Sequence, residues 1–295
     1  MKSISKTIVF FGTEDFSADV LNHLIKSGYP IEFIVTKPDS KSGRGQKIQF
    51  SKVKKLAIKY NIKLLQPTNI KDINQRLLPF ADNLIGILVS FGKILPKSTL
   101  DLFHNGIINI HPSLLPKYRG PSPIESAIYN GDKTTGVSIM KINDRMDAGP
   151  IYKTIEYNLK DDDNQETLYK KLAKLGSEEL IKILPKILDG SLKPNKQNEN
   201  EATYCSMLTK AMADLRPKEY SAAQAERKIR AHIRFPKTRF TVLNHDVIIT
   251  KAHVSQNSES LIDIKCNDDN YLVIDNLLIN GKNMTAQDFI NGYNK

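Results

Sequence analysis

Short apolar runs and helical patterns alternate along the first 190 residues, and this alternation constrains the fold of the chain more than any other feature. Thr7–Phe11 predicts a buried strand, Ser17–Ser27 has helical spacing, and Ile31–Thr36 predicts a second strand. Parallel strands need long crossover connections, so this βαβα order is typical of an α/β fold with a mostly parallel sheet covered on both faces. The same alternation predicts elements at Lys52–Tyr60, Leu84–Ser90, Thr99–Phe103, Gly106–His111, Val137–Lys141, Ile151–Tyr157 and Glu166–Leu188.

The composition changes after the last of these elements. Ser191–Glu201 is rich in Asn, Lys and Glu, which is typical of a linker, and Ala222–Ile233 beyond it has helical spacing. A chain of 295 residues fits two domains, and we expect a first domain over residues 1–189, a linker over 190–208 and a second domain over 209–295. A small β-rich second domain of barrel type is predicted by the alternating runs Arg239–Leu243, Asp246–Thr250, Ser260–Lys265 and Tyr271–Asp275.

The loop after the first strand argues against a nucleotide cofactor. Its sequence is Gly12-Thr13-Glu14-Asp15, which lacks the second and third glycines of a dinucleotide-binding GxGxxG turn. A GxxxxGK[ST] phosphate loop does not occur in the chain either. We therefore expect a ligand other than NAD or ATP at the open edge of the sheet.

Cysteine content and the N-terminus indicate the compartment and argue against a structural metal. Cys205 and Cys266 stand alone, outside any CxxC pair or histidine spacing that suits zinc, so no metal site is expected. The apolar run Ile8–Phe11 is too short for a signal peptide, and no run approaches the roughly 20 apolar residues that cross a bilayer. We expect a soluble cytoplasmic protein without membrane partners.

Two polar side chains share one face of the strand that is predicted to end at His111. Asn109 and His111 are two residues apart, which places them on the same side of a strand, about 7 Å apart along it. Ligands of open α/β sheets bind beyond the carboxyl ends of the strands. An amide that can donate to a developing oxyanion, beside an imidazole that can carry a proton, indicates acyl chemistry. The alternative is a histidine that only satisfies backbone groups.

A histidine that moves protons needs a carboxylate to orient it. The candidate is Asp147, in the Gly-containing turn between the strands predicted at Val137–Lys141 and Ile151–Tyr157. Side chains on such a turn can be aimed at a site. The alternative is an ordinary turn aspartate.

The chain carries 43 Lys and Arg against 32 Asp and Glu, a formal net charge of +11. Residues 36–63 hold nine bases and one acid, and residues 205–239 hold nine bases and three acids. Arg227, Arg230 and Arg234 follow helical spacing and form one predicted basic stripe. Clustered bases indicate phosphate contacts and hence a nucleic acid partner, and the alternative is a solvated lysine-rich surface.

Several motifs together carry a family resemblance over nearly the whole length. They are Phe11-Gly12-Thr13 with Asp15-Phe16, Thr36-Lys37-Pro38-Asp39 leading into Gly43-Arg44-Gly45, Ser90-Phe91-Gly92-Lys93-Ile94-Leu95-Pro96, Asn109-Ile110-His111-Pro112-Ser113-Leu114-Leu115-Pro116, Arg119-Gly120 and Met146-Asp147-Ala148-Gly149-Pro150. On these motifs the chain resembles the 10-formyltetrahydrofolate-dependent formyltransferases. The loop around Arg44 resembles the one that distinguishes the branch of this family that acts on a charged tRNA.

The resemblance implies a Rossmann-like formyltransferase domain, an OB-like barrel that helps to hold tRNA, and formyl transfer from 10-formyltetrahydrofolate to initiator methionyl-tRNA without a metal. The residues that match the catalytic positions are Asn109, His111 and Asp147. Folate contacts are expected at Ser113, Leu114, Leu115, Pro116, Phe91 and Gly92. Contacts with tRNA are expected at Lys41, Arg44, Lys47, Arg227, Arg230 and Arg234.

Other functions fit some of these features. A formyltransferase that acts on a small amine, such as glycinamide ribonucleotide or an amino sugar, keeps the chemistry but has no use for the basic segments. A hydrolase that releases formate to water needs no amine, and a tRNA-binding protein without catalysis leaves Asn109 and His111 structural. We expect a monomer, because the implied substrate is large.

Overall fold

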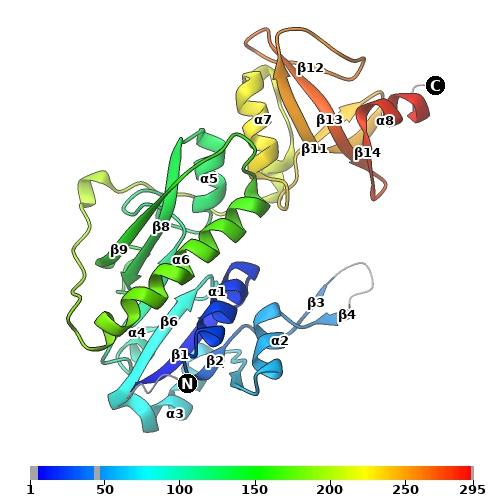
Figure 1. Cartoon of the computed structure of the whole chain (residues 1–295). Coiled ribbons are helices and arrows are strands. Elements are labelled where there is room, and N and C mark those ends of the chain that lie inside the picture. The colour runs from blue at the N-terminus through cyan, green and yellow to red at the C-terminus, as the bar shows by residue number, and fades with distance from the viewer. Residues whose placement is uncertain (1–5, 43–46, 294–295) are drawn as a thin grey trace. The chain divides into compact units, whose positions relative to one another are not determined.

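The computed structural model describes residues 6–42 and 47–293, which divide into two compact units (Figure 1). Each unit is assembled from separate stretches of the chain. The first contains Met1–Arg119, Gly136–Tyr157 and Lys170–Thr203, and the second contains Gly120–Thr135, Asn158–Tyr169 and Tyr204–Lys295.

A seven-stranded sheet in the order β5-β2-β1-β6-β7-β8-β9 forms the centre of the first unit. The strands from β5 to β7 are parallel, and β8 pairs antiparallel with β7. The predicted mostly parallel α/β sheet is thereby confirmed. Its strands are β1 (Thr7–Gly12), β2 (Ile31–Val35), β5 (Lys63–Leu65), β6 (Leu84–Val89), β7 (Ile107–His111), β8 (Thr134–Lys141) and β9 (Ile151–Asn158).

The central strands are buried on both faces, as in a parallel sheet that is covered on both sides. Every residue of β7 is buried, whereas the edge strand β9 has no fully buried residue. Phe11 on β1 anchors one core cluster, because its ring packs edge-to-face against both Phe91 and Phe103 with centroid distances of 5.7 Å. Phe91 thus joins the segment after β6 to the core.

The helices of the first unit follow local sequence signals. In α1, Phe16, Val20 and Leu24 recur at helical spacing and are buried. α2 begins directly after Ser51, the N-cap residue, whose hydroxyl accepts a hydrogen bond from the Lys54 N–H. This unit contains α1 (Asp15–Lys26), α2 (Lys52–Lys59), α3 (Asn74–Leu77), α4 (Lys97–Leu100), most of α6 (Gln165–Leu188) and a hairpin of β3 (Ser40–Ser42) and β4 (Lys47–Gln49).

An antiparallel sheet and α7 form the core of the second unit, as the predicted β-rich module requires. The long strand β13 pairs with β11 on one side and with β12 and β14 on the other. Ala225 and Ile229 of α7 pack in the same apolar cluster as Val247 and Leu277. The elements are α5 (Pro123–Asn130), α7 (Ala222–Ala231), β10 (Arg239–Val242), β11 (His245–Ser255), β12 (Ile264–Lys265), β13 (Tyr271–Ile279), β14 (Lys282–Thr285) and α8 (Ala286–Tyr293).

Some elements differ from the sequence prediction. α5 lies in a Pro- and Ser-rich stretch that has no predicted helix, and it begins with Pro123 in its first turn and ends at Gly131 in the left-handed conformation (φ 73°). α7 ends at Ala231, two residues earlier than predicted, with His232 as its C-cap. Arg234 therefore lies in the following turn and not on the predicted helical stripe. β5, β14 and α8 are further elements without a prediction.

Gly149 lies where a side chain cannot be accommodated. A Cβ at this position would clash with the carbonyl oxygen of Lys141 and would lie 2.9 Å from the Cε of Met140. The close approach lets the turn of residues 142–150 fold tightly against the end of β8, where the Lys141 N–H donates to the carbonyl of Pro150 (2.8 Å).

We expect Gly149→Ala to destabilise the protein by about 1–3 kcal/mol, because the turn must move away from the Lys141 backbone. Urea unfolding measures the change. Gly292→Ala in α8 is the matched control, since a Cβ there meets no atom within 4 Å, and it should stay within about 0.5 kcal/mol of the wild type. Equal stabilities of the two variants would contradict the packing described for Gly149.

A cavity of about 380 Å³ in the second unit is lined by residues that include Glu125, Tyr129, Lys228 and His232. The ring of His232 is stacked on Tyr129 with a centroid distance of 6.2 Å. Burial, with a smaller contribution from the charge of Lys228, lowers the pKa of His232 to about 4. Burial likewise raises the pKa of Glu125.

We expect the free energy of unfolding to fall as the pH drops from about 6.5 to 4, because an unfolded His232 binds a proton over this range and the folded one does not. His232→Phe keeps a stacked ring without a titrating group and should reduce this loss by on the order of 2 kcal/mol. Urea unfolding of both proteins at pH 7 and pH 4.5 measures the difference. An identical pH dependence would contradict the prediction, since other titrating groups are common to both proteins.

Candidate active site

Three parallel strands, β1, β6 and β7, end side by side, and their carboxyl ends together form one edge of the sheet. Gly12 at the end of β1 pairs in register with Val89 at the end of β6, and Leu88 pairs with Asn109 of β7. The segments that follow the strands are tied together, because the Thr13 N–H and hydroxyl donate to the carbonyls of Ser90 and Phe91 at 3.3 Å. Ligands of open α/β sheets bind at such an edge.

Asn109 and His111 lie near this edge on β7 and are both buried, at 7% and 5% exposure. Their spacing on a strand confirms that they share a face. The imidazole of His111 has a defined orientation, because its Nε2 lies 2.9 Å from the carbonyl oxygen of Tyr118. A carbonyl only accepts, so Nε2 carries a proton and donates it. Nδ1 is therefore the nitrogen that gains or loses a proton.

The turn of residues 142–150 brings Asp147 to this histidine. Because β8 is antiparallel to β7, the turn starts next to the beginning of β7, where the Ile142 N–H donates to the Ile107 carbonyl (2.8 Å). The turn must therefore run back along the sheet to reach His111. Asp147 has a left-handed backbone (φ 49°), and its Oδ1 lies 3.7 Å from Nδ1 of His111.

The 3.7 Å separation is an ion-pair distance and is too long for a hydrogen bond. The side chain of Asp147 is 20% exposed and that of His111 is 6% exposed, so solvent reaches the pair mainly from the carboxylate side. The carboxylate faces Nδ1, the ring nitrogen that does not bond to the Tyr118 carbonyl. The pair can hold and release one proton at Nδ1, with the Asn109 amide on the same strand face.

The segment after β7 is held by hydrogen bonds that leave few of its groups open. The hydroxyl of Ser113, which is fully buried, donates to the Lys117 carbonyl (2.6 Å), and the Ser138 hydroxyl on β8 donates to the Ser113 carbonyl (2.8 Å). The N–H of Leu115 donates to the same Ser138 hydroxyl (3.0 Å). Of the four predicted folate contacts here, Ser113 and Leu115 are buried, whereas Leu114 and Pro116 are partly exposed.

The other two predicted folate contacts follow β6. The ring of Phe91 belongs to the core cluster with Phe11 and is 1% exposed, so only its backbone can face a ligand. Gly92 has a left-handed backbone (φ 68°) and an exposed position. Its place in the segment after β6 is at the same edge as the end of β7.

The predicted tRNA contacts near the N-terminus are only partly described. Lys41 and Lys47 belong to β3 and β4, which pair through Lys41 with Ile48 and Ser42 with Lys47. Arg44 lies outside the described residues. The hairpin places the two lysines on paired strands, and their assignment as tRNA contacts stays a prediction.

The predicted tRNA contacts of the second unit already have partners within it. Arg227 donates from Nε to the Tyr129 carbonyl (3.1 Å), and Arg230 forms two hydrogen bonds with Glu226 (2.6 and 2.9 Å). The Arg234 guanidinium lies 5.7 Å from the centroid of the Tyr169 ring. These contacts hold the unit together, and a tRNA phosphate would have to use the remaining donors of each guanidinium.

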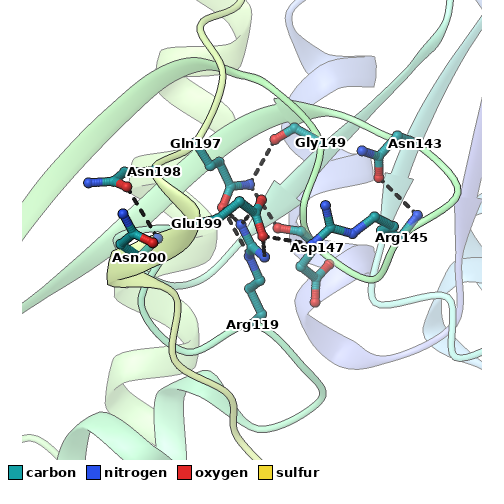
Figure 2. Close-up of polar contacts among 9 residues, drawn as sticks. All are labelled: Arg119, Asn143, Arg145, Asp147, Gly149, Gln197, Asn198, Glu199 and Asn200. Carbon is teal, nitrogen blue, oxygen red and sulfur yellow. Dashed lines mark hydrogen bonds and ion pairs between the residues drawn. The ribbon is translucent and has the colours of Figure 1, made fainter.

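Four groups to which the sequence analysis gives no role support the site. The Tyr118 carbonyl accepts from His111, and the side chains of Arg119, Gln197 and Glu199 lie beside the turn of Asp147 (Figure 2). Arg119 occurs in the Arg119-Gly120 motif, which is the one signal that could have marked it. Gln197 and Glu199 lie in the polar stretch that predicts a linker, about 50 residues from the turn, and carry no signal of their own.

Within the described ranges, no group of three His, Cys, Asp or Glu side chains is placed to hold a metal ion. No helix in the part of the chain that the structure describes is both long and apolar enough to span a membrane.

The sequence profile of the Formyl transferase family matches residues 5–184, and that of the Formyl transferase, C-terminal domain, matches residues 208–294. The chain is 40% identical over 262 residues to a methionyl-tRNA formyltransferase of Buchnera aphidicola subsp. Acyrthosiphon pisum (strain Tuc7), which covers 87% of this chain and 83% of the relative. It is 36% identical over 302 residues to the methionyl-tRNA formyltransferase of Sulfurihydrogenibium sp. (strain YO3AOP1), with coverage of 97% and 96%.

A solved structure shares the fold at lower identity. WlaRD, a sugar 3N-formyl transferase crystallised in the presence of dTDP and 5-N-formyl-THF, matches with a TM-score of 0.68 and 19% identity, over 92% of this chain and 98% of that one. Two family profiles together cover most of the sequence, and full-length relatives exceed one third identity. The chain therefore belongs to the formyl transferase family.

Proposed function

We propose that the protein transfers the formyl group of 10-formyltetrahydrofolate to the free amino group of methionyl-tRNA and thereby forms the initiator N-formylmethionyl-tRNA. The observation that carries this conclusion is the sequence identity of 36–40%, over most of the chain, to two proteins named methionyl-tRNA formyltransferase. The solved sugar formyl transferase is 19% identical, which supports the shared fold and not a sugar substrate.

The proposed chemistry uses the three residues near the end of β7. The amine of methionyl-tRNA adds to the formyl carbon on N10 of the folate, and a negative oxygen develops on that carbon. When this intermediate collapses, the bond from the formyl carbon to N10 breaks, the proton lost by the amine passes to N10, and tetrahydrofolate leaves. The Asn109 amide donates to this oxygen, and the protonated Nδ1 of His111 supplies positive charge beside it. Asp147, 3.7 Å from Nδ1, stabilises the imidazolium and orients the water that relays the proton.

The contacts of the imidazole limit what His111 can do. Because Nε2 donates to the Tyr118 carbonyl, the ring can exchange a proton with a substrate or water only at Nδ1, on the side of Asp147. The proposed proton path therefore runs through the space between Nδ1 and the carboxylate. Catalytic hydrogen bonds are often long in the absence of substrate, and binding of both substrates would have to close this gap or fill it with water.

The same proposal assigns the domains and their partners. Residues 1–189 would form the catalytic domain, residues 190–208 the linker and residues 209–295 the tRNA-binding domain. The family profiles that match residues 5–184 and 208–294 support this division. Folate would lie against Leu114, Pro116 and the backbone of Phe91 and Gly92. The basic segments would contact tRNA phosphates, and the protein would act as a cytoplasmic monomer.

We expect Asn109→Ala and Asp147→Asn each to lower kcat for formylation by at least about 10²-fold, because each removes a group that acts on the developing charge. Both variants should keep the melting temperature of the wild type to within a few degrees. The assay mixes protein, 10-formyltetrahydrofolate and methionyl-tRNA and measures formylmethionine on the tRNA. Turnover at the wild-type rate would remove these residues from the mechanism.

The same assay separates the alternatives. Formate release without formylated tRNA would identify a hydrolase, and formylation of a small amine in preference to the tRNA would identify a small-amine formyltransferase. Tight tRNA binding without any turnover of the wild type would identify a binding protein.

We expect Arg44→Ala to raise KM for methionyl-tRNA several-fold and to reduce the salt dependence of tRNA binding by about one unit of slope, since one phosphate contact is lost. Folate binding should not change. Lys97→Ala, outside the basic segments and paired with Asp101, is the control and should leave both values unaltered. Unchanged kinetics of the Arg44 variant would show that this loop is not a tRNA contact.

A further inference from the structure

Gln197 links a remote stretch of the chain to the turn that carries Asp147. Its Nε2 donates two hydrogen bonds, to the carbonyl of Asp147 at 2.8 Å and to the carbonyl of Gly149 at 2.7 Å (Figure 2). Next to it, Asn195 and Ile151 exchange both backbone hydrogen bonds at 2.7 and 2.8 Å. The stretch around residue 197 therefore runs beside the turn and holds its backbone at two points.

The amide of Gln197 can face the turn in one orientation only. Its Oε1 accepts two hydrogen bonds from Arg119, from Nε at 3.1 Å and from Nη2 at 2.8 Å. A flipped amide would direct Oε1 at two carbonyl oxygens and its NH₂ group at a guanidinium, and all four contacts would be repulsive. Arg119 thus determines that the donor end of Gln197 points at Asp147 and Gly149.

Arg119 is itself held rigidly. Its side chain is fully buried, and Nη1 and Nη2 donate to the two carboxylate oxygens of Glu199 at 3.1 and 3.0 Å. Such a planar bidentate pair fixes direction as well as charge. Glu199 also accepts a hydrogen bond from Arg145 (2.6 Å), which lies on the same turn as Asp147. The turn is therefore held through a backbone contact at Gln197 and a charged contact at Glu199.

The backbone at Asp147 needs such support. A left-handed φ of 49° is unfavourable for an aspartate and persists only when its surroundings hold it. The carboxylate that this backbone presents lies 3.7 Å from Nδ1 of His111, so a small shift of the turn changes the distance on which the pair depends.

We propose that Gln197 is a positioning residue for catalysis, which holds the turn of residues 142–150 so that the Asp147 carboxylate faces His111, and that Arg119 and Glu199 orient Gln197 for this purpose. The inference rests on the proposed function, because it assigns Gln197 a role through Asp147.

The Glu199 carboxylate, which binds Arg119 and Arg145, does not change its protonation state between neutral and mildly acidic pH. Hydrogen bonds from Arg119 and then Arg145 lower the pKa of Glu199 to about 2. The carboxylate therefore stays ionised at neutral and mildly acidic pH. Any pH dependence of activity must come from groups other than Glu199.

The test compares Gln197→Met and Gln197→Glu with the wild type in the formylation assay. Methionine has a similar length and no donor, and glutamate keeps the acceptor for Arg119 but directs an oxygen at the two carbonyls. We expect kcat to fall by about 10–100-fold in both variants, with KM for both substrates within twofold of the wild type. The pH midpoint of kcat should also shift in Gln197→Met, because the carboxylate no longer faces Nδ1 at the same distance.

Asn198→Asp is the matched control. It makes the same amide-to-acid change one residue away, at a side chain whose contacts are Glu201 and the Asn200 N–H, and it should retain wild-type kcat. Hydrogen exchange gives a second measurement: the backbone amides of residues 142–149 should exchange faster in Gln197→Met, and those of α7 should not change.

The outcomes distinguish the two proposals. A wild type that does not formylate methionyl-tRNA overturns the proposed function, whatever the variants do. An active wild type with unchanged kcat and pH profile in both Gln197 variants overturns the positioning role. A parallel loss of melting temperature and a rise of both KM values, with general loss of exchange protection, would make Gln197 merely structural and also overturn it.

Discussion

The pairing of β7 with a parallel strand on one side and an antiparallel strand on the other determines where the groups of the site lie. The parallel register with β6 brings the end of β7 to the edge where β1 and β6 also end. The antiparallel register with β8 sends the next turn away from that edge, so Asp147 reaches His111 only because the turn runs back along the sheet. The active groups thus come from one sheet edge and from a turn that needs support of its own.

Features of the site and fold whose signal lies within a few neighbouring residues could be predicted from the sequence. Asn109 and His111 share a face because a strand has a period of two, and Asp147 could be selected because a Gly-containing turn follows the next predicted strand. The alternation of strands and helices likewise predicted the sheet, although not the strand order. In each case the signal lies within a window of a few residues.

Contacts between distant stretches could not be predicted, because they depend on how the chain returns. The polar composition around Gln197 predicts a linker equally well whether the stretch is solvated or holds a turn 50 residues away. The partners of the Arg227 and Arg230 side chains could not be predicted for the same reason. Helical spacing predicts a basic stripe open to phosphates, whereas the folded unit uses part of each guanidinium for Tyr129 and Glu226.

The acceptor that orients His111 is the main-chain carbonyl of Tyr118, and this has a consequence for how the site tolerates sequence change. No replacement of the tyrosine side chain can remove that oxygen. The ring orientation depends instead on the path of the chain between His111 and Arg119, which the Thr203 hydroxyl and carbonyl secure through the N–H groups of Tyr118 and Arg119. Replacement of the Tyr118 side chain leaves this oxygen in place as long as the left-handed backbone of residue 118 (φ 58°) is kept, whereas insertions or deletions in this short segment displace it.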